Sequence, residues 1–234
     1  MKPRHSLIPL LAIVLLSVAA LPQPSSETSS ELEKVLDQMD KSAAAFRTTE
    51  ASFEWDQYQK VVEETDIQKG KVYFRRSGEE TQMAADISEP DKKYVLFADS
   101  KVQIYQPRID QITVYNAGKN RAEFESFLVL GFGGRGHDLS KSFEVKYLGA
   151  ETVAGIEASK LELVPKAVKV RNTFAKIVLW IDPARGVSIQ QQLFEPSGDY
   201  RLSKFSSIEI NQKISDSVFR IKTTPKTKTV SPQG

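Results

Sequence analysis

The feature of the sequence that most restricts the fold is a long stretch in which apolar residues recur at every second position. It begins near Thr49, its apolar residues are mostly β-branched or aromatic, and turn signals such as Ser88-Glu89-Pro90-Asp91 divide it into short runs. This pattern predicts a series of strands rather than helices. We expect eleven strands, at residues 51–62, 70–76, 81–87, 93–98, 102–106, 111–115, 143–149, 156–164, 176–182, 187–194 and 201–210.

Two helices are expected beside these strands. Residues 31–46 carry apolar side chains at steps of three and four, and Ser30 with Glu33 gives the pattern of a capping box, so we predict an amphipathic helix there. Residues 119–130 are the second helical candidate. Because no second long helix could serve as a bundle partner, the first helix must cover a sheet. The predicted fold class is mainly β (α+β): an open or half-closed antiparallel β-barrel of about eleven strands, with an N-terminal helix and a short central helix covering its concave face.

The beginning of the chain has the layout of a secretory signal peptide. Lys2 and Arg4 precede an apolar run that ends at Ala20 and is shorter than the roughly 20 residues needed to cross a bilayer. We expect cleavage after Ala20 and export to the periplasm, with an uncleaved anchor as the alternative. The predicted segments are a signal peptide at residues 1–20, a flexible tether at 21–30 and a single lipid-binding domain at 31–230.

The composition excludes several classes of function. The chain has 32 basic and 30 acidic residues and a net charge of +2, so we expect no charge-driven nucleic-acid partner. It has no cysteine, which excludes disulfides, thiolate metal sites, cysteine nucleophiles and lipidation of an N-terminal cysteine. Of its two histidines, His5 lies in the predicted signal peptide, and His137 remains.

A glycine-rich segment at residues 131–136 matches the G-x-G-x-x-G pattern of dinucleotide-binding loops. Such a loop needs a preceding strand and a βαβ unit, whereas a helical candidate precedes this segment and antiparallel strands follow it. We interpret the segment as a flexible hinge, because glycine readily adopts positive φ angles. The adjacent His137 and Asp138 have no supporting catalytic or metal-binding motif, so we expect His137 to be a solvated or helix-capping loop residue.

Several segments are most informative through their order along the chain. They are Gly70–Arg76, Glu89–Pro107, Ile109–Thr113, Leu161–Lys166, Lys176–Asp182 and Phe219–Val230. In this succession they resemble the periplasmic outer-membrane lipoprotein carrier family, LolA, and the resemblance runs from about Leu32 to Val230. It implies an open β-barrel with helices over its mouth and an apolar cavity that receives the acyl chains of lipoproteins.

The resemblance also implies partners and one residue role. In that family an inner-membrane ATP-driven transporter supplies the cargo and an outer-membrane acceptor receives it. Arg76 aligns with the family's arginine that tethers the lid to the barrel in the closed state. This sequence departs from the family pattern there, because Ser77 replaces the expected proline and the aromatic residues expected shortly afterwards are missing.

Apolar residues of the predicted strands and helices are the candidates for contact with lipoprotein acyl chains or another lipid. A packed core is the alternative interpretation of the same residues. The candidates are Leu36, Met39, Phe53, Trp55, Val72, Phe74, Met83, Val95, Phe97, Ile104, Phe124, Phe127, Leu128, Leu161, Leu163, Val178, Trp180 and Leu193.

We expect a monomeric carrier that is not an enzyme and needs no cofactor or metal. Two other functions stay open. One is a periplasmic sensor domain, similar to the carrier-like domain of sigma-factor regulators, in which binding of lipid or lipoprotein changes a protein contact. The other is a hydrolase, which His137 and Asp138 alone suggest.

Overall fold

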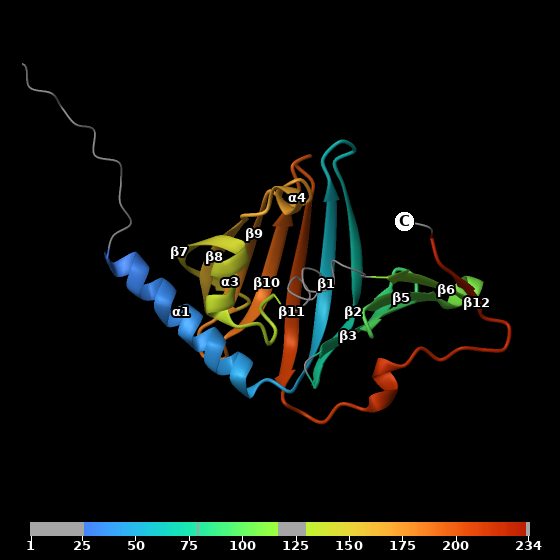
Figure 1. Ribbon diagram of the computed structural model, residues 1–234. Coiled ribbons are helices and arrows are strands. Elements are labelled where there is room, and N and C mark those ends of the chain that lie inside the picture. Colours follow the sequence, from blue (N-terminus) through green and yellow to red (C-terminus); the bar gives the residue numbers. More distant parts are fainter. Residues whose placement is uncertain (1–25, 79, 117–129, 233–234) are drawn as a thin grey trace, which may run out of the picture.

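The computed structural model describes residues 26–78, 80–116 and 130–232, in which one large twisted sheet carries helices on one face (Figure 1). Its strands are β1 (Thr48–Gln59), β2 (Glu64–Ser77), β3 (Glu80–Glu89), β4 (Lys93–Ala98), β5 (Lys101–Gln106), β6 (Gln111–Asn116), β7 (Phe143–Val153), β8 (Ile156–Pro165), β9 (Lys176–Asp182), β10 (Val187–Phe194), β11 (Tyr200–Ile210) and β12 (Lys228–Val230). The helices are α1 (Ser26–Ala45), α3 (Gly136–Ser142) and α4 (Val168–Arg171), with 3-10 turns η1 (Pro107–Ile109) and η3 (Asp216–Phe219).

The strands form two meanders that meet in the middle of the sheet. The order is β12-β6-β5-β4-β3-β2-β1-β11-β10-β9-β8-β7, and the antiparallel pairing of β1 with β11 joins the meander β1 to β6 to the meander β7 to β11. The eleven predicted strands are confirmed in their predicted order. The sequence predicts no strand at β12, which pairs in parallel with β6 and so corrects the expectation of a wholly antiparallel sheet.

Helix α1 begins earlier than the sequence predicts. It starts at Ser26 rather than Glu31, so residues 26–30 of the expected tether are helical and Ser30 lies inside the helix instead of capping it. No proline or glycine occurs between Ser26 and Ala45. Nothing in the local sequence therefore prevents the helix from beginning before Glu31.

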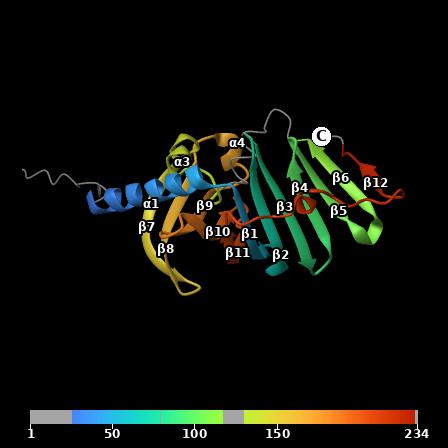
Figure 2. The ribbon, with the colours of Figure 1, turned by 90° about the horizontal axis from the view of Figure 1, so that it is seen from below.

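The apolar stripe of α1 packs on the half of the sheet formed by β7 to β9 (Figure 2). Val35, Leu36 and Met39 form one buried cluster with Leu161 and Leu179 of the sheet. The prediction that the N-terminal helix covers a sheet is confirmed. We call the sheet face that carries α1 the inner face and the opposite one the outer face.

The connection between the two meanders departs from the expectation of a central helix. That predicted helix, residues 119–130, lies almost entirely outside the described residues, and so do the candidates Phe124, Phe127 and Leu128. Within the described part, Leu130 to Gly134 run along the inner face as turns, and α3 follows from Gly136. The sequence predicts no helix at α3, which packs against α1 (Figure 1).

The C-terminal segment crosses the outer face of the sheet (Figure 2). Phe219 of η3 is buried in a cluster with Ala84 and Leu96, and Arg75 lies with its guanidinium 4.1 Å from the centre of the Phe219 ring. Beyond η3, Asp110 accepts hydrogen bonds from the hydroxyls of Thr224 and Thr227 at 2.8 and 2.7 Å. These contacts hold β12, the edge strand of the sheet, against β6.

Candidate functional site

An apolar cavity of about 180 Å³ lies on the inner face between β1, β2, β3, β10 and β11. Its lining consists of Phe53, Trp55, Val72, Phe74, Met83, Ala85, Gln191, Leu193, Arg201, Ser203 and Phe205. Six of these are predicted lipid-contacting residues, and they come from strands far apart in the sequence. Because side chains alternate between the two faces of a strand, the period of two places them together.

The wall of this cavity changes from apolar to polar along β1. Phe53 lies opposite Phe205 of β11, whereas two residues further on Trp55 lies opposite Ser203. Two residues beyond that, Gln57 lies opposite Arg201. One end of the cavity is therefore aromatic, and the other carries hydrogen-bonding groups. A wall of this kind suits an amphiphile, whose hydrocarbon part binds away from the polar end.

Arg201 supplies the positive charge at the polar end. Its Nη2 atom forms an ion pair with Glu195 at 2.9 Å, and its guanidinium carbon lies 5.6 Å from the centre of the Phe174 ring. The side chain is partly exposed, so its remaining N–H donors lie at the border between cavity and solvent.

Phe132 of the glycine-rich segment packs against two aromatic residues of the cavity lining. The Phe132 ring stacks on Phe74 with 5.1 Å between ring centres and meets Phe205 edge to face at 4.8 Å. Only 1% of Phe132 is exposed. The positive φ angles expected for glycines of this segment are found at Gly131 and Gly133; Phe132 is packed into the core whereas Arg135 is exposed, and the role of the segment as a hinge stays a prediction.

Arg76 connects this segment to the sheet and to α1. Its Nη1 atom donates to the carbonyl oxygen of Ala43 in α1, and its Nη2 atom donates to that of Gly133, both at 3.2 Å. The guanidinium carbon also lies 5.6 Å from the centre of the Phe46 ring. One side chain of β2 thus contacts both the end of α1 and the glycine-rich segment, and the tethering role of Arg76 stays a prediction.

Several predicted contact residues lie elsewhere on the inner face. Leu36, Leu161 and Leu163 are fully buried between α1 and the sheet. Met39 belongs to the same cluster and borders a second cavity of about 150 Å³ next to α3.

Three further candidates lie on β4 and β5. Val95 is partly buried and packs on the aromatic cluster around the larger cavity. Phe97 is completely buried, and Ile104 is half-buried. None of these three lines the larger cavity.

Val178 and Trp180 correct the predicted cavity set, because they lie on the outer face. They pack with Ala158 and Ile189, whereas their neighbour Leu179 packs under α1. Residues 177–181 are apolar without interruption, and both faces of β9 are buried. A strand of this kind carries no alternation from which the inward face could be chosen.

A larger hollow of about 680 Å³ on the outer face is chemically different. Its lining includes Glu54, Lys69 and Lys204, and these charges pair with one another at 3.1 Å for Lys69 with Glu54 and 2.8 Å for Lys204 with Glu54. Burial of an acyl chain against such a surface would break ion pairs without comparable apolar contact, so this hollow is a poor lipid site.

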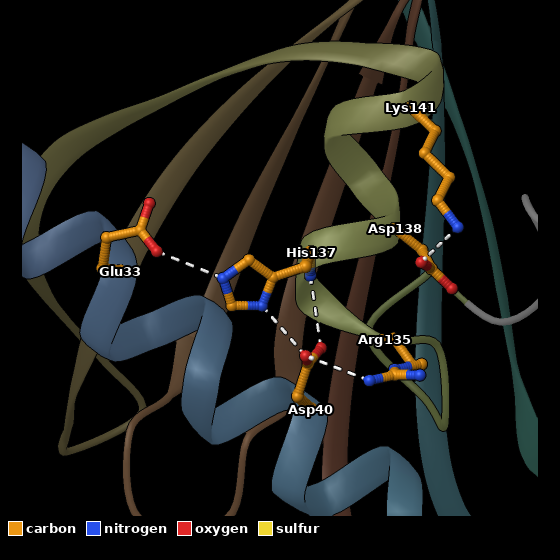
Figure 3. A network of polar contacts seen from close by, with 6 residues as sticks. All are labelled: Glu33, Asp40, Arg135, His137, Asp138 and Lys141. Atoms are coloured by element: carbon orange, nitrogen blue, oxygen red, sulfur yellow. Dashed lines mark hydrogen bonds and ion pairs between the residues drawn. The ribbon is translucent and has the colours of Figure 1, made fainter.

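His137 joins α3 to α1 (Figure 3). Its Nδ1 atom lies 2.9 Å from Oδ2 of Asp40, its Nε2 atom lies 3.1 Å from Oε2 of Glu33, and its backbone N–H donates to Oδ1 of Asp40 at 3.2 Å. Arg135 approaches the same Asp40 carboxylate at 3.7 Å. The residue is helical rather than a loop residue, and its ring is half-exposed.

These contacts shift two pKa values and bear on the hydrolase hypothesis. The hydrogen bond to Asp40, followed by that to Glu33, raises the pKa of His137. Partial burial acts to raise the pKa of Asp40, but the hydrogen bonds and charges of His137 and Arg135 together lower it. Because both ring nitrogens of His137 face carboxylates, neither is placed to activate a nucleophile. Asp138 is turned to Lys141 instead, at 2.8 Å.

Two further observations on the described residues concern metal binding and membrane crossing. None of their His, Asp and Glu side chains gather in threes in a way that could hold a metal ion. None of the helices in the described part of the chain combines the length and hydrophobicity that a membrane crossing requires.

Comparison with known proteins gives a family and a set of similar folds. None of the curated proteins matches the sequence. Among solved structures, an uncharacterized conserved protein from Thermus thermophilus is similar with a TM-score of 0.55 and 11% identity, over 86% of this chain and 99% of that chain. MucB is similar with a TM-score of 0.52 and 12% identity, over 85% of this chain but 64% of that chain.

The family assignment comes from the sequence itself. The family model described as outer membrane lipoprotein carrier protein LolA matches residues 44–222, a range that includes β1 to β11, Arg76 and every residue of the apolar cavity. Members of this family are extracytoplasmic proteins that bind lipids or lipoproteins. The cavity, the helix over the inner face and the family model agree, and the chain belongs to the LolA family of outer membrane lipoprotein carrier proteins.

Proposed function

We propose that this protein is a periplasmic carrier that holds acyl chains of lipoproteins, or of another lipid, in the inner-face cavity. The observation that carries the proposal is the aromatic and aliphatic cavity between β1, β2, β3, β10 and β11, with polar groups at one end. Such a wall can bury hydrocarbon and leave a polar head near solvent. Each methylene group removed from water contributes about 0.8 kcal/mol, so even a partly buried acyl chain would bind tightly.

The proposal also covers export of the protein and the direction in which it carries lipid. We propose that residues 1–20 direct export and are removed, and that an ATP-driven inner-membrane transporter loads the carrier. The sequence has no G-x-x-x-x-G-K-[ST] loop, and a partner would therefore supply the energy for loading. Transfer to an outer-membrane acceptor then follows from the relative affinities of carrier and acceptor for the same acyl chain.

The test is to express the full chain in a bacterium with a periplasm and to purify it without detergent. Native mass spectrometry before and after organic extraction should reveal bound acyl species, and the recovered apo-protein should take up a fluorescent fatty acid. A protein that carries no acyl species and takes none up would contradict the proposal. A copurifying signalling protein of the inner membrane, in place of a transporter, would favour the sensor hypothesis.

The proposal does not include catalysis. His137 and Asp138 alone suggest a hydrolase, and their side chains are engaged with Asp40, Glu33 and Lys141. A hydrolase would release free fatty acid from the bound lipid during prolonged incubation. We expect the bound lipid to be recovered intact.

A further inference from the structure

The two edges of the sheet are finished differently. One edge is the three-residue strand β12, which Asp110 holds in place through Thr224 and Thr227. The other edge is β7, which is 11 residues long and pairs only with β8 among the described residues. A long edge strand presents unpaired N–H and C=O groups to any chain that can lie beside it. β7 is therefore the place where a further strand can be added to this sheet.

The pairing of β7 with β8 shows which of its backbone groups face the open edge. In an antiparallel pair, successive residues turn their N–H and C=O groups alternately toward and away from the partner strand. Lys166 donates its backbone N–H to the carbonyl oxygen of Ser142 at 2.9 Å, so Ser142 is turned toward β8. Phe143 lies opposite Pro165, which has no N–H to donate, and is turned away. Every second residue from Phe143 onward is therefore turned to the open edge.

Val145 and Tyr147 are the residues whose backbone groups are available at this edge. The N–H of Phe143 already donates to the end of α3, so the available segment begins after that residue. It ends at a bulge, because the register with β8 shifts between Tyr147 and Ala150, and a bulge interrupts strand pairing. Residues 144–148 are left for an added strand.

The exposed side chains of this segment include two charges without partners. Side chains alternate along the strand, so Val145 and Tyr147 pack on the cluster under α1, whereas Glu144, Lys146 and Leu148 lie on the outer face and are exposed. Lysines of β8 and β9 on the same face pair with glutamates at 2.8 and 3.0 Å. Neither charge of the β7 segment has such a partner among the described residues. An added strand would find an acidic, a basic and an apolar side chain in this order along β7.

Helix α1 projects beyond β7 and leaves room for one strand beneath it (Figure 2). Leu32 packs on the same buried cluster as Val145 and Tyr147, so α1 crosses β7 near this residue. Residues 26–31 precede it in the helix and are about 9 Å long at 1.5 Å per residue. Neighbouring strands lie about 4.8 Å apart. The projecting part of α1 is therefore long enough to cover one added strand.

The position of α1 argues against a second copy of this chain as the added strand. Two β7 strands related by a two-fold axis would bring both copies of α1 to the same face of the joined sheet. Because α1 crosses β7 in the middle of the open segment, both helices would lie over the junction. A helix with its side chains is about 10 Å wide, so the two would collide. The added strand must come from a chain without a helix on that face.

We propose that residues 144–148 of β7 are a docking site for an extended segment of a partner polypeptide, which joins the sheet as an antiparallel strand. From its N-terminus, the segment carries an apolar, an acidic and a basic residue at alternate positions, opposite Leu148, Lys146 and Glu144. These three positions are non-hydrogen-bonded pairs at the open edge, where side chains come closest, so the charges select the partner sequence. The inference goes beyond the carrier function and does not depend on a bound lipid.

The probe is the capped heptapeptide Thr-Leu-Thr-Glu-Thr-Lys-Thr, and Thr-Leu-Thr-Lys-Thr-Glu-Thr is the control with its charges exchanged. In NMR titration of the full chain to millimolar peptide, the amide signals of Val145 and Tyr147 should shift. The probe should bind roughly tenfold more tightly than the control, because two cross-strand charge pairs change sign. Lys146→Glu should remove most of this preference. Equal affinities of the two peptides, or unchanged signals at both amides, would overturn the inference.

Proline substitution tests the backbone part of the inference. Val145→Pro removes an N–H that no strand of the sheet uses, so it should leave the fold intact and abolish binding of the probe. Val145→Ala keeps the N–H and should bind the probe within about twofold of the wild type. Glu144→Pro removes an N–H that is turned toward β8 and should lower the thermal unfolding temperature. Tight binding by Val145→Pro, or its failure to fold, would overturn the inference.

The same variants separate the inference from the proposed function. Val145 and Lys146 do not line the apolar cavity, so both variants should take up a fluorescent fatty acid like the wild type. If the wild type binds the probe but no fatty acid, the docking site stands and the carrier proposal is contradicted. If it takes up fatty acid but does not bind the probe, the carrier proposal stands and the docking site is overturned.

Discussion

The two halves of the inner face are covered in different ways. Under α1, the sheet residues Leu161, Leu163, Ile177, Leu179 and Ile181 are completely buried, and the smaller cavity of about 150 Å³ in this half lies beside α3. On β1 to β3 the face is covered by a short segment, and an apolar cavity remains beside it. We therefore expect the half under α1 to open less readily than the half under the short segment, which is held by one ring and a few hydrogen bonds.

The largest effect should come from a leucine of the helix-covered half. Leu161→Ala should lower the free energy of unfolding by about 2 to 5 kcal/mol, because the fully packed site cannot collapse around the missing atoms. Leu193→Ala makes the same chemical change at a partly exposed residue of the cavity wall and should cost about 1 to 2 kcal/mol. Urea unfolding measures both, and equal losses would remove the contrast between the halves.

The next effect concerns the backbone of the segment over the cavity. Gly133→Ala places a Cβ against Phe46, whereas Gly155→Ala is a control with the same φ of +80° and open space around it. Each change costs about 1 to 2 kcal/mol for the left-handed conformation, and Gly133→Ala should cost about 1 kcal/mol more through the clash with Phe46. Equal stability of the two variants in thermal unfolding would contradict the close contact between Gly133 and the Phe46 ring.

Arg76 should have a smaller effect on stability and a clear one on exchange of lipid. Arg76→Ala removes two hydrogen bonds to the carbonyls of Ala43 and Gly133 and should cost about 1 to 3 kcal/mol, as is typical for hydrogen bonds from a charged group. Release of a fluorescent fatty acid should become faster, because the segment opens more often. Arg76→Lys lacks the planar fork that reaches both carbonyls, so its release rate should lie between those of the wild type and Arg76→Ala. Unchanged release in Arg76→Ala would argue against a tethering role.

The smallest effect should come from His137, which joins α3 to α1 at the surface. Its raised pKa means that the charged imidazole stabilises the folded state fully below the ordinary histidine value of about 6.5, and this contribution is lost as pH rises through the folded-state pKa. The lowered pKa of Asp40 acts oppositely, since its contribution is present above about pH 4 and lost as pH falls.

The difference in unfolding free energy between wild type and His137→Gln should therefore be greatest between about pH 4 and pH 6.5. It should stay below about 1 kcal/mol, because exposed pairs are weak. The measurement is chemical denaturation across a pH series, and the matched comparison is Asp138→Asn, which breaks a pair inside α3 without touching α1. A difference that grows above pH 7 would contradict the assignment.

The sequence predicts the strands well because their signals are local. Most strands carry their own period of two, β9 carries a continuous apolar run, and turn residues separate them, so the eleven predicted strands are present in order. Strand β12 is different, since it is three residues long, exposed and defined by its pairing with β6. Nothing within residues 228–230 distinguishes a strand from an extended tail.

The site could be predicted only where the alternation of side chains is visible. Phe53, Trp55, Val72 and Phe74 alternate with polar neighbours and do line the cavity. Residues 177–181 are apolar on both faces of β9. The alternation of side chains therefore could not show that Val178 and Trp180 lie on the outer face and not among the cavity residues. Phe132 lies among glycines, and these led to the interpretation of the segment as a hinge. Its burial depends on Phe74 and Phe205, which are far away in the chain.

The most direct test of lipid binding in this cavity uses the two tryptophans of the chain. Trp55 lines the inner-face cavity and Trp180 lies on the outer face. Trp180→Phe therefore keeps a fluorescent reporter only in the cavity, and Trp55→Phe keeps one only on the outer face. Titration with palmitate brominated along its chain should quench Trp55 strongly in Trp180→Phe and leave Trp180 nearly unchanged in Trp55→Phe. Quenching of Trp180 alone, or of neither tryptophan, would contradict the placement of the lipid in this cavity.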